Sequence, residues 1–287
     1  MSLHVNYLYL LHQATLDARE YWPVVLDYGC GSGQILEEGR KAGLEIYGAE
    51  VFYEGGNTRA EIEKQGWLGT VVREIENGII PFENNFFDLV TSNQVLEHVE
   101  DLDAVLYEIH RVLKPGGAFL CMFPTRERIR EGHCGIPFIH WFPKQSRLRY
   151  FFALALRRIG FGYCKGDKSA SQWVSDFLQW LDRFTFYRDM ETISTSFREY
   201  FEISLMDDDY IAFRLNRQGR TLLSRIFQLP FIRPLSCTLF RRLGQVVILA
   251  RKVEDPGLPT LDNRLRPDWE HVRTQVTAHS ANSLNCQ

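Results

Sequence analysis

Several features that would assign this chain to a specialised class of protein are missing from its sequence. The six cysteines are spread along 287 residues and form neither a CxxC pair nor a Cys/His spacing typical of metal ligands. No disulfide framework and no metal site are therefore expected. Long apolar runs are absent, and the first twenty residues lack the basic start and small-residue cleavage site of a secretory signal. These absences favour a cytoplasmic protein.

An excess of charge of one sign is missing as well. The chain has 33 Lys and Arg and 36 Asp and Glu, a formal net charge of −3, which argues against polyanion binding driven by bulk charge. Hydrophobic residues make up 45% and charged residues 24% of the chain, as in ordinary globular proteins. The composition excludes wholesale disorder and a transmembrane bundle. The length suits one large domain or a core with an elaboration.

Up to residue 124 the sequence alternates between strand and helix patterns. Alternation at this pace predicts an α/β fold, a doubly wound and mostly parallel sheet with helices on both faces. Helices are expected over residues 5–20, 34–42, 56–65 and 101–113. Strands are expected at the start of 24–33 and over 44–52, 68–73, 87–95 and 117–124.

Beyond Pro124 the character of the sequence changes. Residues 125–145 read as a loop rich in aromatic residues and histidine, and residues 146–188 as aromatic helices. Two more strands are expected at 201–215 and 244–253, which brings the sheet to seven. The expected parts are a core at 1–124, a loop and helical substrate lid at 125–200, the last two strands at 201–253 with a basic helical insertion at 217–243, and a polar tail at 254–287.

The strongest local signal is a glycine-rich turn, Asp27-Tyr28-Gly29-Cys30-Gly31-Ser32-Gly33, at the end of the first expected strand. Glycines are needed where the backbone turns tightly and comes close to a ligand. Glu50 follows Gly29 by 21 residues, at a place where a carboxylate can accept both hydroxyls of a ribose. A structural turn explains the glycines alone about as well, so the pairing with Glu50 is what indicates a nucleoside site.

Asp27 indicates which nucleoside ligand fits. The pattern is GxGxG and not the dinucleotide GxGxxG, and a pyrophosphate favours backbone amides without a negative charge nearby. A carboxylate at this place suits a ligand with an ammonium group, which favours S-adenosylmethionine over NAD. The alternative is that Asp27 only orders the turn.

Four segments, VLDYGCGSGQ, YGAEVF, IIPFENNFFDLVTSNQVLEHV and RVLKPGGAFLCMFP, carry a resemblance to a known family. They resemble class I S-adenosylmethionine-dependent methyltransferases, in the branch with an LEH segment after the fourth strand. The resemblance covers about residues 24–124, in order and at normal spacings. It implies a Rossmann-like fold, methyl transfer from S-adenosyl-L-methionine, and S-adenosyl-L-homocysteine as the product.

The resemblance also implies which residues hold the cofactor. Glu50 would bind the ribose hydroxyls, and Val51 would pack on the adenine. Glu76 and Asn77 match the position beside the adenine amino edge, where Glu76 is one methylene longer than the family's aspartate. Asn93 matches a loop after the fourth strand that touches the cofactor. The methionine part would be held by Asp27, Gly29, Gly31 and Gly33.

Three histidines are candidates for a general base, because methyl transfer mainly needs positioning of the acceptor and removal of its proton. His98 lies in the LEH segment, where it could equally cap or pack the turn. His133 and His140 follow the fifth strand, in a loop that is either a substrate lid or core of the elaboration. Their separation of seven residues is not that of a metal pair on a helix.

Two absent motifs narrow the acceptor. The fourth strand is followed neither by the Asn/Asp-Pro-Pro-Tyr/Phe motif of adenine N-methylation nor by a Pro-Cys motif for cytosine C5 chemistry. DNA is therefore not an expected partner. We expect O-methylation of a small-molecule, saccharide or lipid-linked acceptor. The alternative is a non-catalytic S-adenosylmethionine-binding subunit that acts on a partner through its helical elaboration.

Positive charge is concentrated in two segments, although the total charge is nearly balanced. Residues 144–168 and 217–243 each carry a net charge of +6. In the second, arginines alternate with bulky apolar residues, which is typical of helices in peripheral contact with an anionic membrane surface. A lid packed on the core or a site for an anionic substrate would have the same composition. RNA is disfavoured, because no RNA-binding module is recognisable.

Overall fold

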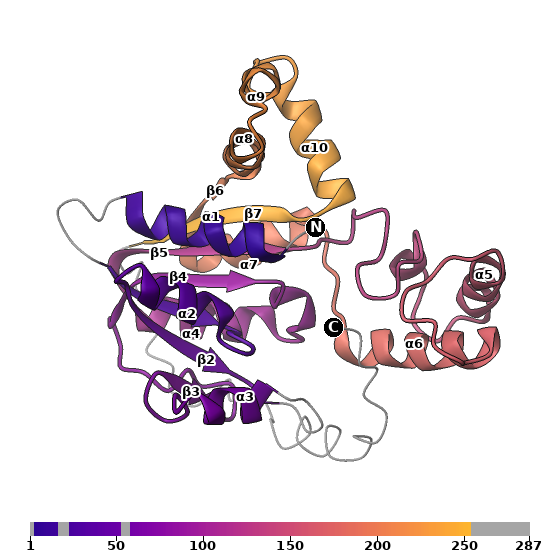
Figure 1. Cartoon of the computed structure of the whole chain (residues 1–287), viewed down its shortest axis with the longest axis horizontal. Helices are drawn as coiled ribbons and strands as arrows, with labels where there is room; N and C mark the ends of the chain where they lie inside the picture. The colour runs from indigo at the N-terminus through magenta and orange to yellow at the C-terminus, as the bar shows by residue number, and fades with distance from the viewer. Residues whose placement is uncertain (1–2, 17–22, 53–57, 254–287) are drawn as a thin grey trace.

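The computed structural model describes residues 3–16, 23–52 and 58–253 (Figure 1). Its centre is a seven-stranded sheet with the strand order β3-β2-β1-β4-β5-β7-β6. The tail expected at 254–287 lies outside the described residues. The strands are β1 (Val24–Tyr28), β2 (Glu45–Glu50), β3 (Val72–Glu74), β4 (Phe87–Asn93), β5 (Leu113–Phe123), β6 (Phe201–Leu205) and β7 (Val246–Lys252).

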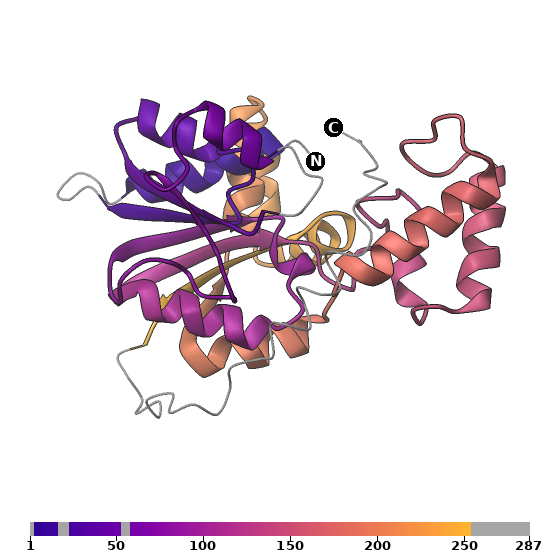
Figure 2. The same ribbon diagram turned by 90° about the horizontal axis from the view of Figure 1, so that it is seen from below.

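Helices cover both faces of the sheet (Figure 2). Each face has its own apolar core, and the helices contribute side chains spaced three or four residues apart, such as Val105, Ile109 and Val112. One face packs against α4 (Leu102–Val112) and α7 (Met190–Tyr200), the other against α1 (Leu3–Leu16), α2 (Gln34–Lys41), α3 (Thr58–Lys64) and α8 (Asp207–Arg217).

The winding of the sheet reverses beside β1. This strand pairs in parallel with β2 on one side and with β4 on the other. In open α/β sheets, ligands bind outside the carboxyl ends of the strands at such a reversal. The turn at residues 29–33 begins directly after β1, so the fold places it where a ligand is expected.

The strand β7 runs antiparallel to both of its neighbours. β7 pairs with β5, where Val246 lies opposite Phe123, and with β6 on its other side. The strands β1 to β5 are all parallel. The expected doubly wound, mostly parallel seven-stranded sheet is confirmed.

The helices α5 (Arg147–Arg158) and α6 (Ala170–Phe184) lie beside the sheet and do not cover it (Figure 1). They have a small core of their own, formed by buried residues between Cys134 and Leu181. At the centre of this core, the ring centroids of Trp173 and Phe177 are 4.5 Å apart. The Nε1–H of Trp173 donates a hydrogen bond to the carbonyl of Tyr163. We call this part of the chain, residues 131–184, the side lobe.

Four cysteines, Cys30, Cys121, Cys134 and Cys237, carry free thiols. Burial raises the pKa of the Cys30 and Cys121 thiols, which keeps them protonated and unreactive.

The strand expected at 201–215 is shorter than its pattern indicated. β6 ends at Leu205, and α8 begins at Asp207. Aspartates fill the first turn of α8 at residues 207–209, where the helix dipole stabilises negative charge. The Asp207 carboxylate also accepts a hydrogen bond of 2.9 Å from the N–H of Val247. The expectation of one long strand was wrong, because these local interactions start a helix.

The helices α8, α9 (Thr221–Phe227) and α10 (Arg233–Leu243) project from the side of the sheet that carries α1 (Figure 1). α8 is anchored by Tyr210, which is fully buried and donates a hydrogen bond to the side chain of Asn6. In α10 no residue is buried. No helix within the described ranges has both the length and the apolar character needed to cross a membrane.

Candidate functional site

The turn after β1 is held against the end of β2 by backbone hydrogen bonds. The N–H of Gly29 donates to the carbonyl of Ala49 at 2.8 Å, and the N–H of Gly33 donates to that of Cys30 at 2.9 Å. Gly29 and Gly31 have φ angles of 75° and 53°, which glycine adopts without strain. The turn is therefore a well-fixed loop at the carboxyl edge of the sheet.

Gly29, Gly31 and Gly33 differ in what surrounds them. A Cβ at Gly29 would lie 2.4 Å from Cγ2 of Val95, and a Cβ at Gly33 would lie 3.0 Å from the ring of Trp67. A Cβ at Gly31 would meet no atom within 4 Å. Gly29 and Gly33 are thus required for packing, and Gly31 is the position where the backbone borders open space that a ligand can occupy.

Asp27 is a buried carboxyl group just before the turn, and it is 4% exposed. The hydroxyl of Thr91 donates a hydrogen bond of 3.1 Å to it. Burial, together with the charge of Glu50, raises the pKa of Asp27 to about 8, against the lowering effect of the Thr91 bond. The charge of Asp27 in turn adds to burial in raising the pKa of Tyr7 on α1. A cation beside Asp27 would offset the cost of its ionisation.

Glu50 lies at the end of β2, next to the turn. Its carboxylate accepts hydrogen bonds from the N–H of Gly31 at 2.5 Å and from the N–H of Val51 at 2.9 Å. Burial raises the pKa of Glu50, and these two bonds oppose the rise. The structure thus brings together Gly31 and Glu50, which the sequence pattern had paired across the first two strands.

The residues expected beside the adenine lie along the same edge. Val51 directly follows β2 and is 38% exposed. Glu76 and Asn77 belong to an exposed turn after β3, in which Asn77 has a φ of 53°. The N–H of Ile75 donates to the carbonyl of Glu50 at 2.8 Å, so this turn is held next to Glu50.

Asn93, at the end of β4, is part of a polar network that the sequence did not reveal. Its Oδ1 accepts a hydrogen bond of 2.8 Å from Asn6 of α1. Asn6 also donates to Gln245 at 3.2 Å, and Gln245 accepts a bond of 2.9 Å from Gln94. The one sign of this network in the sequence was Asn6, a polar residue among the apolar residues of the first helix. The partners of Asn6 are distant in the sequence and could not be inferred from it.

A second polar group lies where the core meets the side lobe, and it contains two of the predicted histidines. The residues 96–98 form a short turn after Val95, the residue that packs on Gly29. The ring centroids of His98 and His133 are 5.0 Å apart. The Nδ1–H of His98 donates to the carbonyl of Phe184 at 2.6 Å. His98 therefore follows by three residues the Val95 that packs on the glycine turn, and it contacts the side lobe.

Glu131 was not singled out from the sequence, yet it organises this group. It is fully buried and accepts hydrogen bonds from His133 Nδ1 at 2.7 Å, from the hydroxyl of Tyr187 at 2.6 Å and from the N–H of Cys134 at 2.6 Å. Burial opposes its ionisation, but these bonds lower the pKa of Glu131 to about 2. Glu131 therefore stays charged and orients His133.

Glu97 and His98 lie in an environment that disfavours their charged forms. Burial raises the pKa of Glu97 to about 7. Burial, followed by the charge of His133, lowers the pKa of His98 to about 4. For His133, burial lowers the pKa, but the bond and charge of Glu131 outweigh it and raise the pKa. The pKa values of these two neighbouring imidazoles are thus shifted in opposite directions from the ordinary value of histidine.

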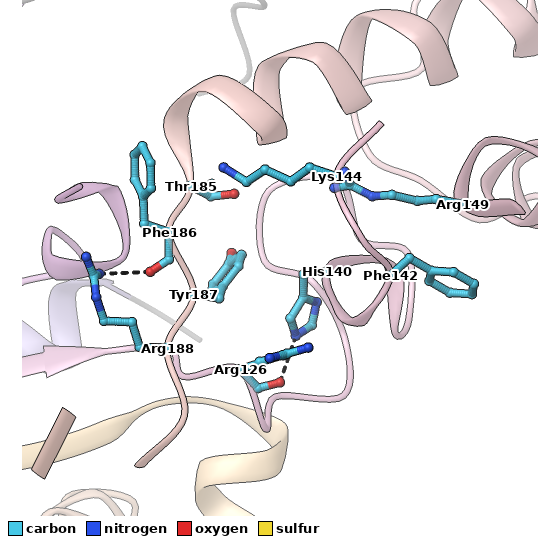
Figure 3. Close-up of a pocket in the computed structure, with 9 residues that line it drawn as sticks. All are labelled: Arg126, His140, Phe142, Lys144, Arg149, Thr185, Phe186, Tyr187 and Arg188. Atoms are coloured by element: carbon cyan, nitrogen blue, oxygen red, sulfur yellow. Dashed lines mark hydrogen bonds between the residues drawn. The ribbon is translucent and has the colours of Figure 1, made fainter. Parts of the chain in front are cut away.

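His140, the third predicted histidine, lines a cavity of about 330 Å³ between the core and the side lobe (Figure 3). Its Nε2–H donates to the carbonyl of Arg126 at 3.2 Å, and its ring lies 4.8 Å from that of Tyr187. Tyr187 also bonds Glu131, so the cavity adjoins the His133 group. Its lining carries four cations, Arg126, Lys144, Arg149 and Arg188. Arg149 is paired with Asp182, and the other three favour an anionic occupant.

Residues 26–121 match a family model described as a methyltransferase domain. This part of the chain is a class I S-adenosylmethionine-dependent methyltransferase domain. The methyltransferase domain contains the glycine turn, Glu50 and Asn93, whereas His133 and His140 lie beyond it. The family and the cofactor S-adenosylmethionine predicted from the sequence are confirmed. The branch with the LEH segment and the individual contacts to the cofactor stay predictions.

Curated relatives share the methyltransferase domain but not the whole chain. A demethylmenaquinone methyltransferase of Symbiobacterium thermophilum is 30% identical over 126 residues, which cover 41% of this chain and 48% of the relative. Human mitochondrial arginine-hydroxylase NDUFAF5 is 31% identical over 121 residues, which cover 42% of this chain and 34% of the relative. The chain thus spans about half or less of the length of these relatives.

A solved structure is similar over a longer stretch at low identity. The YcgJ protein of Bacillus subtilis is 14% identical, with a TM-score of 0.48, over 88% of this chain and 100% of that one. NDUFAF5, whose name gives a hydroxylation, also contains a region similar to the methyltransferase domain. The domain by itself therefore leaves the acceptor and the reaction of the whole protein open.

Proposed function

We propose that this chain transfers the methyl group of S-adenosylmethionine to an oxygen of a small-molecule, saccharide or lipid-linked acceptor and releases S-adenosylhomocysteine. The observation that carries the proposal is the cradle formed by Asp27, Gly31 and Glu50. Gly31 borders open space, Glu50 is bonded to its N–H, and Asp27 is buried beside it. The relative named for methylation of demethylmenaquinone supports a small-molecule acceptor.

Each part of the cradle suits one part of the cofactor. A ligand ammonium or sulfonium next to Asp27 supplies the positive charge that makes a buried carboxylate stable. Glu50 has further lone pairs for ribose hydroxyls, and the exposed side chain of Val51 offers an apolar surface to adenine. The open space beside Gly31 leaves room for the methionine part.

The reaction needs an acceptor in line with the sulfonium and a place for its proton. The S–CH3 bond breaks with its electron pair on sulfur, the O–CH3 bond forms, and the hydroxyl proton goes to a base. We assign the base to the pair of His98 and His133. Of the two, His98 comes three residues after Val95, which packs on Gly29. His133 donates its Nδ1–H to Glu131, so its Nε2 can accept a proton while Glu131 stabilises the imidazolium. The cationic cavity beside His140 suits an acceptor that carries an anionic group.

Transfer of labelled methyl groups tests this proposal. The full chain is incubated with S-adenosylmethionine labelled in the methyl group and a cell extract, which is then separated into small-molecule, lipid, saccharide, protein and nucleic-acid fractions. We expect label in one of the first three fractions. Glu50→Ala is the matched control, because losing charge-assisted bonds to the ribose should weaken cofactor affinity by about 1–3 kcal/mol, roughly 5–150-fold.

Other outcomes separate the alternatives. No label in any fraction, with S-adenosylhomocysteine binding intact by calorimetry, would favour the non-catalytic subunit. Label in protein or nucleic acid would overturn the acceptor class. Unchanged affinity in Glu50→Ala would remove Glu50 from the ribose role.

A second proposal concerns location, namely that α9 and α10 dock on an anionic membrane surface. Three leucines of α10, four residues apart, and Phe231 before it are highly exposed, and Phe231 is 95% exposed. Segment 217–243 carries six arginines and no acidic residue. Arg233 and Arg241 pair with Asp208 and Asp207 of α8, which leaves other arginines to face lipid headgroups. The leucines are Leu235, Leu239 and Leu243.

Sedimentation with vesicles tests this docking. We expect the chain to pellet with vesicles of phosphatidylglycerol and phosphatidylcholine, and the bound fraction to fall as salt rises, because exposed charges are screened within about 10 Å at 0.1 M salt. Phe231→Ser with Leu235→Ser should weaken binding, since together they remove the two most exposed of these four apolar side chains. Leu148→Ser is the matched control, because Leu148 is 68% exposed but lies on α5. Equal recovery in the supernatant with and without vesicles would contradict the proposal.

A further inference from the structure

The three residues Glu97, His98 and His133 bring three ligand atoms together at the junction of the core and the side lobe. These atoms, one from each side chain, all lie within 4.8 Å of one another. Glu97 and His98 come from the turn after β4, and His133 from the loop after β5. We propose that this group binds one divalent transition-metal ion, with Zn²⁺ as the reference ion.

The carboxylate of Glu97 is the observation that points to a ligand. Glu97 is 2% exposed, and neither of its two carboxylate oxygens has a hydrogen-bond partner within the part of the chain that the structure describes. A buried carboxylate without partners is costly, and buried charges are normally paired or bound to metals. A cation between Glu97 and the two imidazoles would satisfy these oxygens.

In both imidazoles the hydrogen bond of Nδ1 leaves Nε2 available for a metal. Nδ1 of His98 lies 2.6 Å from the carbonyl of Phe184, which can only accept, so Nδ1 carries the proton. Nδ1 of His133 lies 2.7 Å from a carboxylate oxygen of Glu131, which accepts in the same way. In both rings Nε2 is therefore left with a free electron pair. Neutral imidazole with its other nitrogen fixed in this way is the usual form of a metal-bound histidine.

The surroundings of the ligands are those of a metal site. Metal-bound histidines usually donate their second N–H to a carboxylate or a backbone carbonyl, as His133 does to Glu131 and His98 to Phe184. Glu131 is itself fixed by the Tyr187 hydroxyl and the N–H of Cys134. The ligands are thus held from outside by residues of both the core and the side lobe.

The charges close to the group are compatible with a divalent ion. Glu97 and Glu131 supply two negative charges, and the two imidazoles are neutral when they bind a metal. Arg128 is the cation that influences both Glu97 and His133. The Nε of Arg128 is buried, and it makes no hydrogen bond to Glu97 among the described residues. Two nitrogens and one oxygen suit Zn²⁺ and its neighbours, whereas Mg²⁺ and Ca²⁺ prefer oxygen ligands only.

Three protein ligands leave at least one position of the ion open, as in catalytic zinc sites. If the proposed function holds, an acceptor hydroxyl at that position would become more acidic. In that case the ion replaces the histidine base of the proposed function: His98 and His133 would hold the ion, the acceptor oxygen would bind it in the deprotonated form, and the proton would leave to bulk water. Metal binding is measured separately from methyl transfer, so the two proposals can fail independently.

Titration calorimetry with the full chain, stripped of metal by a chelator, tests the site. We expect Zn²⁺ to bind at one ion per chain, with no comparable binding of Mg²⁺. Glu97→Gln and His133→Ala should each weaken Zn²⁺ binding by at least about 10-fold, and Glu131→Gln by about 10–100-fold through the lost orientation of His133. His140→Ala is the matched control, because this histidine lies outside the group, and we expect unchanged Zn²⁺ affinity.

Folding of the variants is checked by thermal unfolding with and without Zn²⁺. Glu97→Gln removes an unpaired buried carboxylate, so we expect this variant to fold and to lose the rise in Tm that Zn²⁺ gives the unchanged chain. The proposal is overturned if Zn²⁺ does not bind at one ion per chain, or if binding survives in both Glu97→Gln and His133→Ala. It is also overturned if Mg²⁺ competes equally. Zn²⁺ binding in a chain that labels no acceptor would count against the proposed function only.

Discussion

Gly29→Ala is expected to lower the free energy of unfolding by about 2–5 kcal/mol. A Cβ at this position would lie 2.4 Å from Cγ2 and 2.8 Å from Cγ1 of Val95. Forcing an extra methyl group into a packed site typically costs about 1–3 kcal/mol. The φ of 75° adds about 1–2 kcal/mol for a residue with a side chain. Chemical denaturation at constant pH measures the sum.

Two further variants show whether the contact with Val95 is the cause. Gly31→Ala has a similar positive φ but open space around its Cβ. We therefore expect a loss of only about 1–2 kcal/mol in stability, together with weaker S-adenosylhomocysteine binding. Val95→Ala placed in Gly29→Ala should recover part of the lost stability, which a double-mutant cycle detects. Equal losses for Gly29→Ala and Gly31→Ala would contradict the packing role of Gly29.

Asp27→Asn is expected to make the cofactor-free protein more stable and the cofactor complex weaker. The pKa of Asp27 is raised to about 8 in the folded protein, from an ordinary value of 3.8. Its ionisation therefore costs stability as pH rises from about 4, where the unfolded chain loses the proton, to about 8, where the folded protein does. By linkage this cost is on the order of 5 kcal/mol, and relaxation around the site reduces it.

The measurement compares urea unfolding of both proteins at pH 5, 7 and 8.5. The stability of Asp27→Asn minus that of the unchanged chain should grow with pH and reach about 1–3 kcal/mol at pH 8.5. S-adenosylmethionine affinity should fall by about 10–100-fold, because a charge-assisted bond to the ammonium group is lost. The matched control is Asp88→Asn, which removes a partly exposed carboxylate paired with Lys114 at the start of β4. A stability difference that does not change with pH would refute the assignment to Asp27.

The parts of the fold that follow from local sequence were predictable. The first five strands and the glycine turn are encoded by short apolar runs and by glycines at fixed offsets, and the structure has them close to the expected places. Glu50 was predictable because parallel strands bring the ends of β1 and β2 to one edge. The boundary between β6 and α8 was not, because it depends on the bond between Asp207 and Val247.

The functional group around His133 shows the limit of a sequence pattern most clearly. His98 and His133 were identified as separate candidates, but nothing in the sequence places them 5.0 Å apart. Glu131 gains its role from Tyr187, which is 56 residues away. A fixed spacing in the sequence identifies metal ligands only when they lie on the same helix, strand or loop. The ligands proposed here come from two loops, and the expectation of no metal site rested only on spacing.

The position of β7 between β5 and β6 affects how the protein matures during synthesis. Gln245 lies just before β7, so it can meet Asn6 and Gln94 only after nearly all of the sheet has left the ribosome. Until then β5 has an unpaired edge, which is prone to pair with other chains. A nascent chain that stalls before residue 245 would therefore expose an aggregation-prone edge and lack the bonds of Gln245 to Asn6 and Gln94, which would make it a target for chaperones and proteases.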